Sequence, residues 1–182
     1  AWGPDIAPGG DSQERTSLQE EVLWKRFEES LGRINPTAPH GVLVEAVRRF
    51  RRRLQEEPNA TRCNRVFQEM LTEGIRIEHR EGGKSKTIPV WIVARDDLDL
   101  NDWFAVNQVE VWHDRNHRIP DIVVYLNGLP ISVIELKTFA TEQVHLLNAF
   151  KQLQTYKKEI PLLFRTNEVL VSSNGVYSRI GS

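Results

Sequence analysis

The sequence predicts an α/β fold in which a mixed β-sheet is flanked by helices. Segments with helical periodicity dominate the first 70 residues, and short β-branched runs joined by turn signals fill the middle of the chain. A long amphipathic helix then separates these runs from a last pair of strands. Because hairpins pair antiparallel and a helical crossover joins parallel strands, the sheet should contain both kinds of pairing.

The expected elements begin after a tail. Residues 1–16 are rich in Gly, Pro and Asp without periodicity, so we expect a flexible tail there and one folded domain over 17–182. Helices are expected at 17–30, 41–57 and 59–72, the last two separated by Pro58, which cannot continue a helix. With no initiator Met and an end close to the last strand, the sequence suggests a piece of a longer polypeptide.

Seven strands and a crossover helix are expected in the rest of the chain. The strands cover 75–79, 87–94, 103–112, 119–126, 131–137, 168–173 and 176–180, and the helix covers 141–159. Gly82-Gly83-Lys84-Ser85 resembles the end of a phosphate loop, but the first glycine of that motif is replaced by Glu78. We therefore expect a hairpin tip at these glycines and no ATPase motif in the chain.

Length and composition fit one soluble domain. The chain has 182 residues, a formal net charge of −1 and a single cysteine, Cys63. A chain of this size buries roughly 70% of its unfolded surface, which suffices for one core but not for two full domains. One cysteine excludes an internal disulfide framework, and no apolar run is long enough to span a bilayer. We expect a cytoplasmic protein with no membrane partner.

The central chemical feature is a pair of acidic residues, Asp121 and Glu135, on an expected hairpin. The Asn127-Gly128 step between two apolar runs is a strong hairpin signal. A two-residue loop would place the two carboxylates on opposite faces. A three-residue loop, Asn127-Gly128-Leu129, would place Asp121 opposite Glu135, with Cβ atoms about 5 Å apart. The sequence therefore predicts a three-residue loop or a bulge.

This pairing suits a hard divalent cation. Mg²⁺ prefers carboxylate oxygens and keeps several waters, one of which can become the attacking hydroxide. Asp121 and Glu135 would bind the cation together with the carbonyl of Leu136, and Lys137, on the face of Glu135, would orient the water and offset developing charge. The alternative is a hairpin with solvated edge charges, which is disfavoured because both faces of these strands are apolar.

Asp121 with Glu135-x-Lys137 resembles the PD-(D/E)xK nuclease superfamily, RecB-like branch, and flanking segments resemble one of its members. That member is the N-terminal endonuclease domain of the restriction (R) subunit of Type I restriction-modification enzymes. The two-carboxylate pattern alone is weakly specific, whereas the ordered set of segments is strong. The segments are Asn64-x-x-Phe67-x-x-Met70-Leu71-x-Glu73-Gly74-Ile75, Asn101 to Gln108, Asp121-Ile122-Val123, Val133 to Lys137, Gln152-x-x-x-Tyr156, Ile160-Pro161-x-x-Phe164 and Val171-Ser172-Ser173-Asn174-Gly175.

Three further site residues are suggested. Gln152 and Tyr156 are spaced i, i+4 and share a helix face, with Gln152 on the border of an apolar stripe and Tyr156 within it. The resemblance implies that they contact the site or the DNA backbone. The stripe comprises Leu146, Ala149, Phe150 and Leu153. Glu20 lies on the apolar face of the first expected helix, and the resemblance suggests that it, or the adjacent Glu21, approaches the metal.

The resemblance implies a Type I site-specific deoxyribonuclease, a hydrolase that cleaves duplex DNA with Mg²⁺ or with Mn²⁺ in its place. It also implies a C-terminal helicase-like motor that uses ATP outside this chain, and separate methyltransferase and specificity subunits. Two other functions stay open. One is a stand-alone repair nuclease or junction resolvase, and the other is a non-catalytic DNA or subunit docking module with the same fold.

Overall fold

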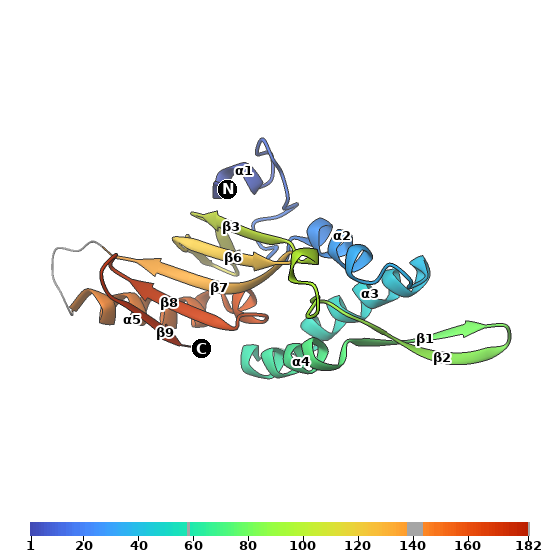
Figure 1. Ribbon diagram of the computed structural model, residues 1–182. Helices are drawn as coiled ribbons and strands as arrows, with labels where there is room; N and C mark the ends of the chain where they lie inside the picture. Colours follow the sequence, from blue (N-terminus) through green and yellow to red (C-terminus); the bar gives the residue numbers. More distant parts are fainter. Residues whose placement is uncertain (58, 138–143, 182) are drawn as a thin grey trace.

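The computed structural model describes residues 1–57, 59–137 and 144–181, and in the last range it describes side chains from residue 148 onward (Figure 1). The helices are α1 (Gly3–Ile6), α2 (Trp24–Ile34), α3 (His40–Glu56), α4 (Ala60–Glu73) and α5 (Val144–Glu159), with short 3-10 turns η1 (Leu98–Leu100) and η2 (Pro161–Phe164). The strands are β1 (Ile75–Glu81), β2 (Lys84–Val90), β3 (Trp103–Asn107), β4 (Val111–His113), β5 (Asn116–Arg118), β6 (Ile122–Leu126), β7 (Leu129–Leu136), β8 (Val169–Ser173) and β9 (Ser178–Gly181).

A five-stranded mixed sheet in the order β3-β6-β7-β8-β9 forms the centre of the molecule. Among the five described strands of this sheet, β7 and β8 pair in parallel, and α5, which lies between them in the sequence, covers one face of the sheet (Figure 1). The remaining neighbours in this sheet are antiparallel. The predicted α/β fold is therefore confirmed. The β1-β2 hairpin projects away from the sheet and turns at Gly82-Gly83, as expected (Figure 1).

The first helix starts later than expected, because the backbone of residues 17–23 is held in another conformation. The guanidinium of Arg15 donates to the carbonyls of Leu18 and Glu20, each at 2.7 Å. The carboxylate of Glu20 in turn accepts from the backbone N–H of Thr16 at 2.7 Å. These side-chain bonds occupy groups that a helix would use within its backbone, so α2 begins only at Trp24.

The N-terminal segment is part of the folded body rather than the tail suggested by its composition. Ile6 and Arg15 are fully buried. Trp2 forms a parallel bridge with Asn107, whose N–H donates to the carbonyl of Ala1 at 3.1 Å. Two anchoring side chains and one edge bridge therefore order a segment that has little apolar content. In the part of the chain described, no helix has the length and apolarity needed to cross a membrane.

Two hydrophobic clusters hold the elements together, and the segment just before α2 contributes to both, with Val22 in the first and Leu23 in the second. The first joins α2, α3, α4 and the base of the β1-β2 hairpin, where the rings of Phe27 and Phe50 lie 4.7 Å apart. The second lies between the sheet and α5, and it includes Val123, Val133 and Leu153. Burial of these side chains fixes the sheet relative to α5, because each fully buried side chain of this size contributes about 1.5–3 kcal/mol.

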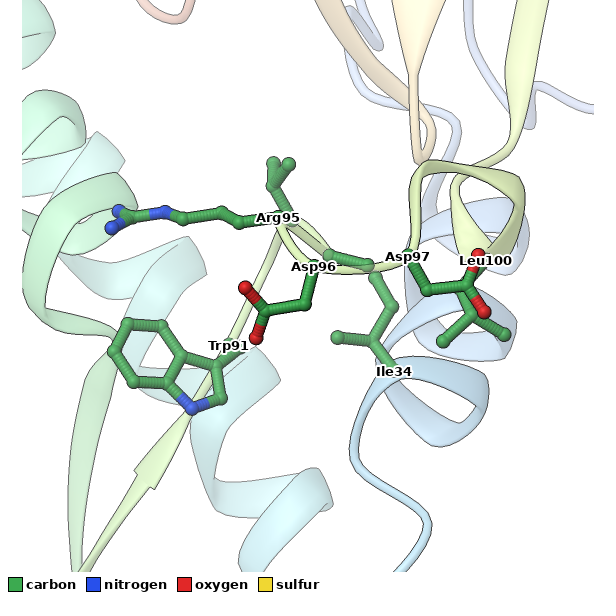
Figure 2. A pocket seen from close by; sticks show the side chains of 8 residues that line it. Ile34, Trp91, Arg95, Asp96, Asp97 and Leu100 are labelled. Atoms are coloured by element: carbon green, nitrogen blue, oxygen red, sulfur yellow. The ribbon is translucent and has the colours of Figure 1, made fainter.

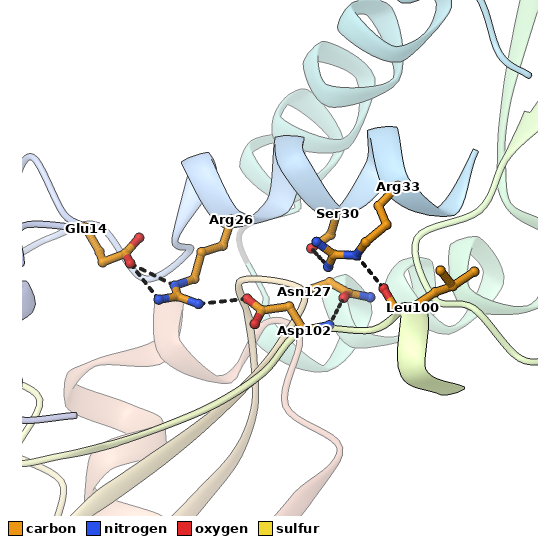
Figure 3. Close-up of polar contacts among 7 residues, drawn as sticks. All are labelled: Glu14, Arg26, Ser30, Arg33, Leu100, Asp102 and Asn127. Carbon is orange, nitrogen blue, oxygen red and sulfur yellow. Dashed lines mark hydrogen bonds and ion pairs between the residues drawn. The ribbon is translucent and has the colours of Figure 1, made fainter. Parts of the chain in front are cut away.

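The turn between β6 and β7 is locked by a polar network (Figure 3). Asn127 is fully buried with φ +52°, a conformation that Asn tolerates better than most residues. Its side chain accepts from the N–H of Asp102 at 2.7 Å and donates to the carbonyl of Ile92 at 2.9 Å. Arg26 of α2 bridges the carboxylates of Asp102 and Glu14 at 2.9 and 2.7 Å. The network ties the turn to α2.

Close backbone contact strengthens the same junction. Gly128 has φ +79°, and a Cβ on it would lie 2.4 Å from the carbonyl oxygen of Leu23. The Gly128 carbonyl accepts from the N–H of Leu23 at 2.8 Å. A second arginine of α2, Arg33, donates to the carbonyl of Leu100 at 2.7 Å (Figure 3). Only glycine fits at position 128, so the turn sequence also determines where α2 starts.

A bulge in the β6-β7 hairpin sets the register of the acidic pair. The turn has two residues, Asn127-Gly128, so the expected three-residue loop is wrong. The pairing then shifts by one residue, and beyond the shift Ile122 faces Ile134. This register places Asp121 opposite Glu135 on one face. The alternative expectation of a bulge is thus confirmed. The bulge places Asp121 opposite Glu135, which the two-residue turn alone would not do.

Candidate active site

The candidate site lies where β6 begins and β7 ends. Asp121 directly precedes β6, and Glu135 lies in β7 with an exposed fraction of 2%. The Asp121 carboxylate accepts two hydrogen bonds, from the N–H of Leu136 to Oδ2 at 2.7 Å and from Nε2 of Gln108 to Oδ1 at 3.2 Å. The carboxylate is therefore oriented by donors on both oxygens, beside the buried Glu135.

Glu135 is held on one oxygen only. Lys137 Nζ donates to Glu135 Oε1 at 2.9 Å, whereas the buried Oε2 has no hydrogen-bond partner among the described residues. Burial raises the pKa of Glu135, and the nearby Asp121 carboxylate adds to the rise while Lys137 opposes it. Two adjacent carboxylates, one with an unpartnered buried oxygen, are a donor set that a hard cation such as Mg²⁺ prefers. The residues therefore fit a divalent metal.

Lys137 is fixed by a chain of polar side chains from α5. Its Nζ donates to Gln152 Oε1 at 2.7 Å, and Gln152 Nε2 donates to the hydroxyl of Tyr156 at 2.6 Å. The backbone N–H of Lys137 donates to the carbonyl of Ser173 on β8 at 2.8 Å. Burial raises the pKa of Tyr156 to about 12, so this hydroxyl stays protonated near neutral pH. The structure thus brings Gln152 and Tyr156 to the predicted site through Lys137.

The apolar stripe of α5 differs in one position from expectation. Ala149 and Leu153 are buried against the sheet, as expected. Phe150 is 51% exposed, so its assignment to the stripe is wrong. It borders a small pocket with Ile180 of β9, at the edge of the sheet. The expectation for Leu146 concerns a side chain outside the described residues.

The expected helical glutamate does not join the acidic pair. Glu20 and Glu21 lie in the loop before α2. The prediction that they lie on a helix, and that Glu20 shares its apolar face, is therefore wrong. The Glu20 carboxylate accepts from the backbone N–H and hydroxyl of Thr16 at 2.7 and 3.0 Å. Across the residues that the structure describes, no group of three or more His, Cys, Asp or Glu side chains is placed to hold a metal.

Gln108 is a site residue that sequence reasoning missed. Its side chain reaches Asp121 from the end of β3. The sequence contains a signal only in the Asn101 to Gln108 segment used for the family resemblance, and nothing in its residue types indicates a role at the carboxylates. The contact depends on the antiparallel pairing of β3 with β6, which places the end of β3 beside the start of β6.

A separate pocket lies elsewhere and lacks this chemistry (Figure 2). It has a volume of about 420 Å³ and is lined mainly by the segment between β2 and β3, with Ile34 from the end of α2. Two acids line it, Asp96 and Asp97, but Asp97 caps η1 by accepting from the N–H of Asp99 at 3.2 Å. Figure 2 shows the Asp96 and Asp97 side chains pointing apart, so they form no carboxylate pair.

The sequence is similar to a described protein family over almost its whole length. Residues 2–182 match the family described as Type I restriction enzyme R protein N terminus. The chain is 32% identical over 182 residues to the Type I restriction enzyme HindI endonuclease subunit of Haemophilus influenzae, covering all of this chain and 17% of that protein. It is 29% identical over 183 residues to a Methanocaldococcus jannaschii protein whose name proposes it as the type I restriction enzyme MjaIXP endonuclease subunit, again covering 17% of the relative. The chain therefore belongs to the family of Type I restriction enzyme R protein N termini.

Proposed function

We propose that this domain is the Mg²⁺-dependent endonuclease of a Type I restriction enzyme and hydrolyses phosphodiester bonds of duplex DNA. The observation that carries the proposal is the placement of Asp121 opposite Glu135, with a buried, unpartnered Glu135 oxygen and Lys137 beside it. Structural ion pairs normally satisfy both oxygens of a buried carboxylate. An unsatisfied oxygen on the carboxylate opposite Asp121 supports a bound cation at this pair.

The roles of the side chains follow from these contacts. Asp121 and Glu135 would hold the cation, with the carbonyl of Leu136 as a third ligand, and Mn²⁺ could replace Mg²⁺. The metal ion supplies Lewis acidity and lowers the pKa of a bound water. Lys137 orients the attacking water and stabilises negative charge that develops on the phosphate. Gln152 holds the Lys137 ammonium in place at 2.7 Å, which limits the reorganisation needed during reaction.

The rest of the enzyme lies outside this chain, which spans 17% of the length of the relatives described above. Those relatives are named as endonuclease subunits, which supports a nuclease role in restriction. We propose that the same subunit carries a C-terminal helicase-like motor driven by ATP. Separate specificity and methyltransferase subunits would select the DNA. The complex would act in the cytoplasm.

Metal binding should raise the thermal stability of the domain. At a Mg²⁺ or Mn²⁺ concentration about ten times Kd, linkage adds about 1.4 kcal/mol, which raises the melting temperature by about 3–6 °C over a chelator control. Because the pKa of Glu135 is raised in the fold, the stability of the metal-free protein falls as pH rises and this carboxyl ionises. The cation, in contrast, binds the ionised carboxylate. The metal-induced rise in melting temperature should therefore be larger at neutral pH than at about pH 5.

Differential scanning fluorimetry with and without chelator measures this shift. Asp121→Asn and Glu135→Gln serve as variants that keep side-chain shape but weaken metal binding, and both should lose most of the shift. Equal shifts in the wild type and in both variants would place the cation elsewhere. The same melting temperature with metal and with chelator would contradict a shared metal site.

A further inference from the structure

Gln108 contacts Asp121 at both its backbone and its carboxylate. The backbone N–H of Gln108 donates to the Asp121 carbonyl at 2.9 Å, and Nε2 donates to Oδ1 at 3.2 Å. The N–H of Leu136 donates to the other carboxylate oxygen at 2.7 Å. With its backbone tied and a donor on each oxygen, the Asp121 carboxylate has one preferred orientation relative to Glu135.

The backbone of Gln108 adopts a conformation that is uncommon for its residue type. Its φ is +56°, in the left-handed region that favours glycine and, among other residues, mainly Asn and Asp. Such a conformation persists when the surroundings determine it, and it often marks a functional site. The surroundings of Gln108 therefore need an explanation.

The N-terminal segment supplies that support by direct backbone contact. A Cβ on Gly3 would lie 1.9 Å from the carbonyl oxygen of Gln108 and 2.9 Å from that of Asn107. Only glycine allows α1 to approach this closely. The contact is maintained by the parallel bridge between Trp2 and Asn107 and by the fully buried Ile6. Figure 1 shows α1 beside the β3 edge of the sheet.

We propose that Gln108 is a positioning residue for Asp121, and that α1, through Gly3, holds Gln108 in its working conformation. The inference rests on the proposed metal site, because Gln108 would act by orienting the carboxylate oxygens of Asp121 toward the cation. Residues that orient a metal ligand without touching the metal typically change affinity by about 10- to 100-fold when removed. The N-terminal segment would then be part of the catalytic apparatus rather than a tail.

The affinity of the 182-residue chain for Mn²⁺, measured by electron paramagnetic resonance of the free ion, tests this role. Gln108→Gly removes the amide donor and suits φ +56°, so the fold should be retained while affinity falls by about 10-fold or more. Gly3→Ala leaves Gln108 intact but displaces its backbone, and affinity should fall by a similar factor. In the double variant the two effects should not add, because both act through one contact.

Two variants provide matched controls. Gly32→Ala places a methyl group on α2 where nothing lies within 4 Å, so Mn²⁺ affinity should be unchanged. Gln68→Ala removes another side-chain amide that binds a carboxylate, that of Glu168, on a different part of the molecule. It should also leave affinity unchanged. Melting curves in chelator identify any variant that fails to fold, and Gln108→Gly decides the question if Gly3→Ala is unfolded.

Asp121→Ala separates this inference from the function on which it rests. Loss of Mn²⁺ binding in Asp121→Ala together with a 10-fold or larger loss in Gln108→Gly supports the positioning role. Loss in Asp121→Ala with wild-type affinity in Gln108→Gly overturns the positioning role and leaves the proposed site standing. Wild-type affinity in Asp121→Ala overturns the site and the positioning role together.

Discussion

Replacing Lys137 with alanine should reduce DNA cleavage by about 100- to 1000-fold, because removal of one group that stabilises transition-state charge typically has an effect of this size. Asp121→Ala and Glu135→Ala should reduce cleavage at least as strongly. The double variant Asp121→Ala with Glu135→Ala should be hardly slower than either single variant, since members of one catalytic unit fail together. The measurement is nicking and linearisation of circular DNA by the enzyme assembled with the full subunit.

The control for charge and residue type is Lys151→Ala, which removes an exposed lysine of α5 and should cleave like the wild type. ATP hydrolysis measured in the same reactions should be unchanged in all variants, because we place the motor outside this chain. Wild-type cleavage by Lys137→Ala would contradict the assigned role. Loss of ATP hydrolysis accompanied by a melted domain would show that these residues hold the fold instead.

Replacing Arg15 with methionine should lower the free energy of unfolding by about 3 kcal/mol or more. Arg15 has an exposed fraction of 0%, and its guanidinium donates to the carbonyls of Glu20, Leu18 and Glu110 at 2.7, 2.7 and 2.6 Å. Methionine fills a similar volume but leaves these three part-buried carbonyls without their donor, at a cost of about 1 kcal/mol or more for each. The midpoint of urea unfolding of the 182-residue chain measures the loss.

Arg48→Met on α3 is the matched control for this substitution. Arg48 is exposed, and its ion pair with Glu45 has an N–O distance of 3.9 Å, so the free energy of unfolding should change by less than about 0.5 kcal/mol. If Arg15→Met and Arg48→Met unfold at the same urea concentration, the buried guanidinium does not organise the N-terminal segment and the loop before α2.

The arrangement of the candidate site could be predicted from the sequence because it depends on spacing within regular elements. Strand alternation places Lys137 on the face of Glu135, and helix periodicity places Gln152 and Tyr156 together. Both relations are found, with the Lys137 ammonium 2.9 Å from Glu135 and 2.7 Å from Gln152. The requirement that the two carboxylates share a face also predicted a bulge as one solution for the hairpin.

The parts that sequence reasoning missed depend on contacts between distant segments. The loop before α2 is non-helical because the Arg15 guanidinium binds its carbonyls, which local propensity does not reveal. Phe150 is exposed and borders a pocket with Ile180 of the edge strand β9, which lies far along the chain. Gln108 lies beside Asp121 because β3 pairs with β6, a pairing between segments distant along the chain. None of these relations has a periodic signature along the chain.

The most direct test of the shared metal site is anomalous diffraction from crystals of the domain grown with Mn²⁺. We expect one anomalous peak about 2.2 Å from a carboxylate oxygen of Asp121 and from Oε2 of Glu135, with the carbonyl of Leu136 also within coordination distance. The peak should be absent in crystals of Asp121→Asn grown in the same way. A wild-type structure with Mn²⁺ bound elsewhere, or with Lys137 bridging both carboxylates and no metal between them, would contradict the account.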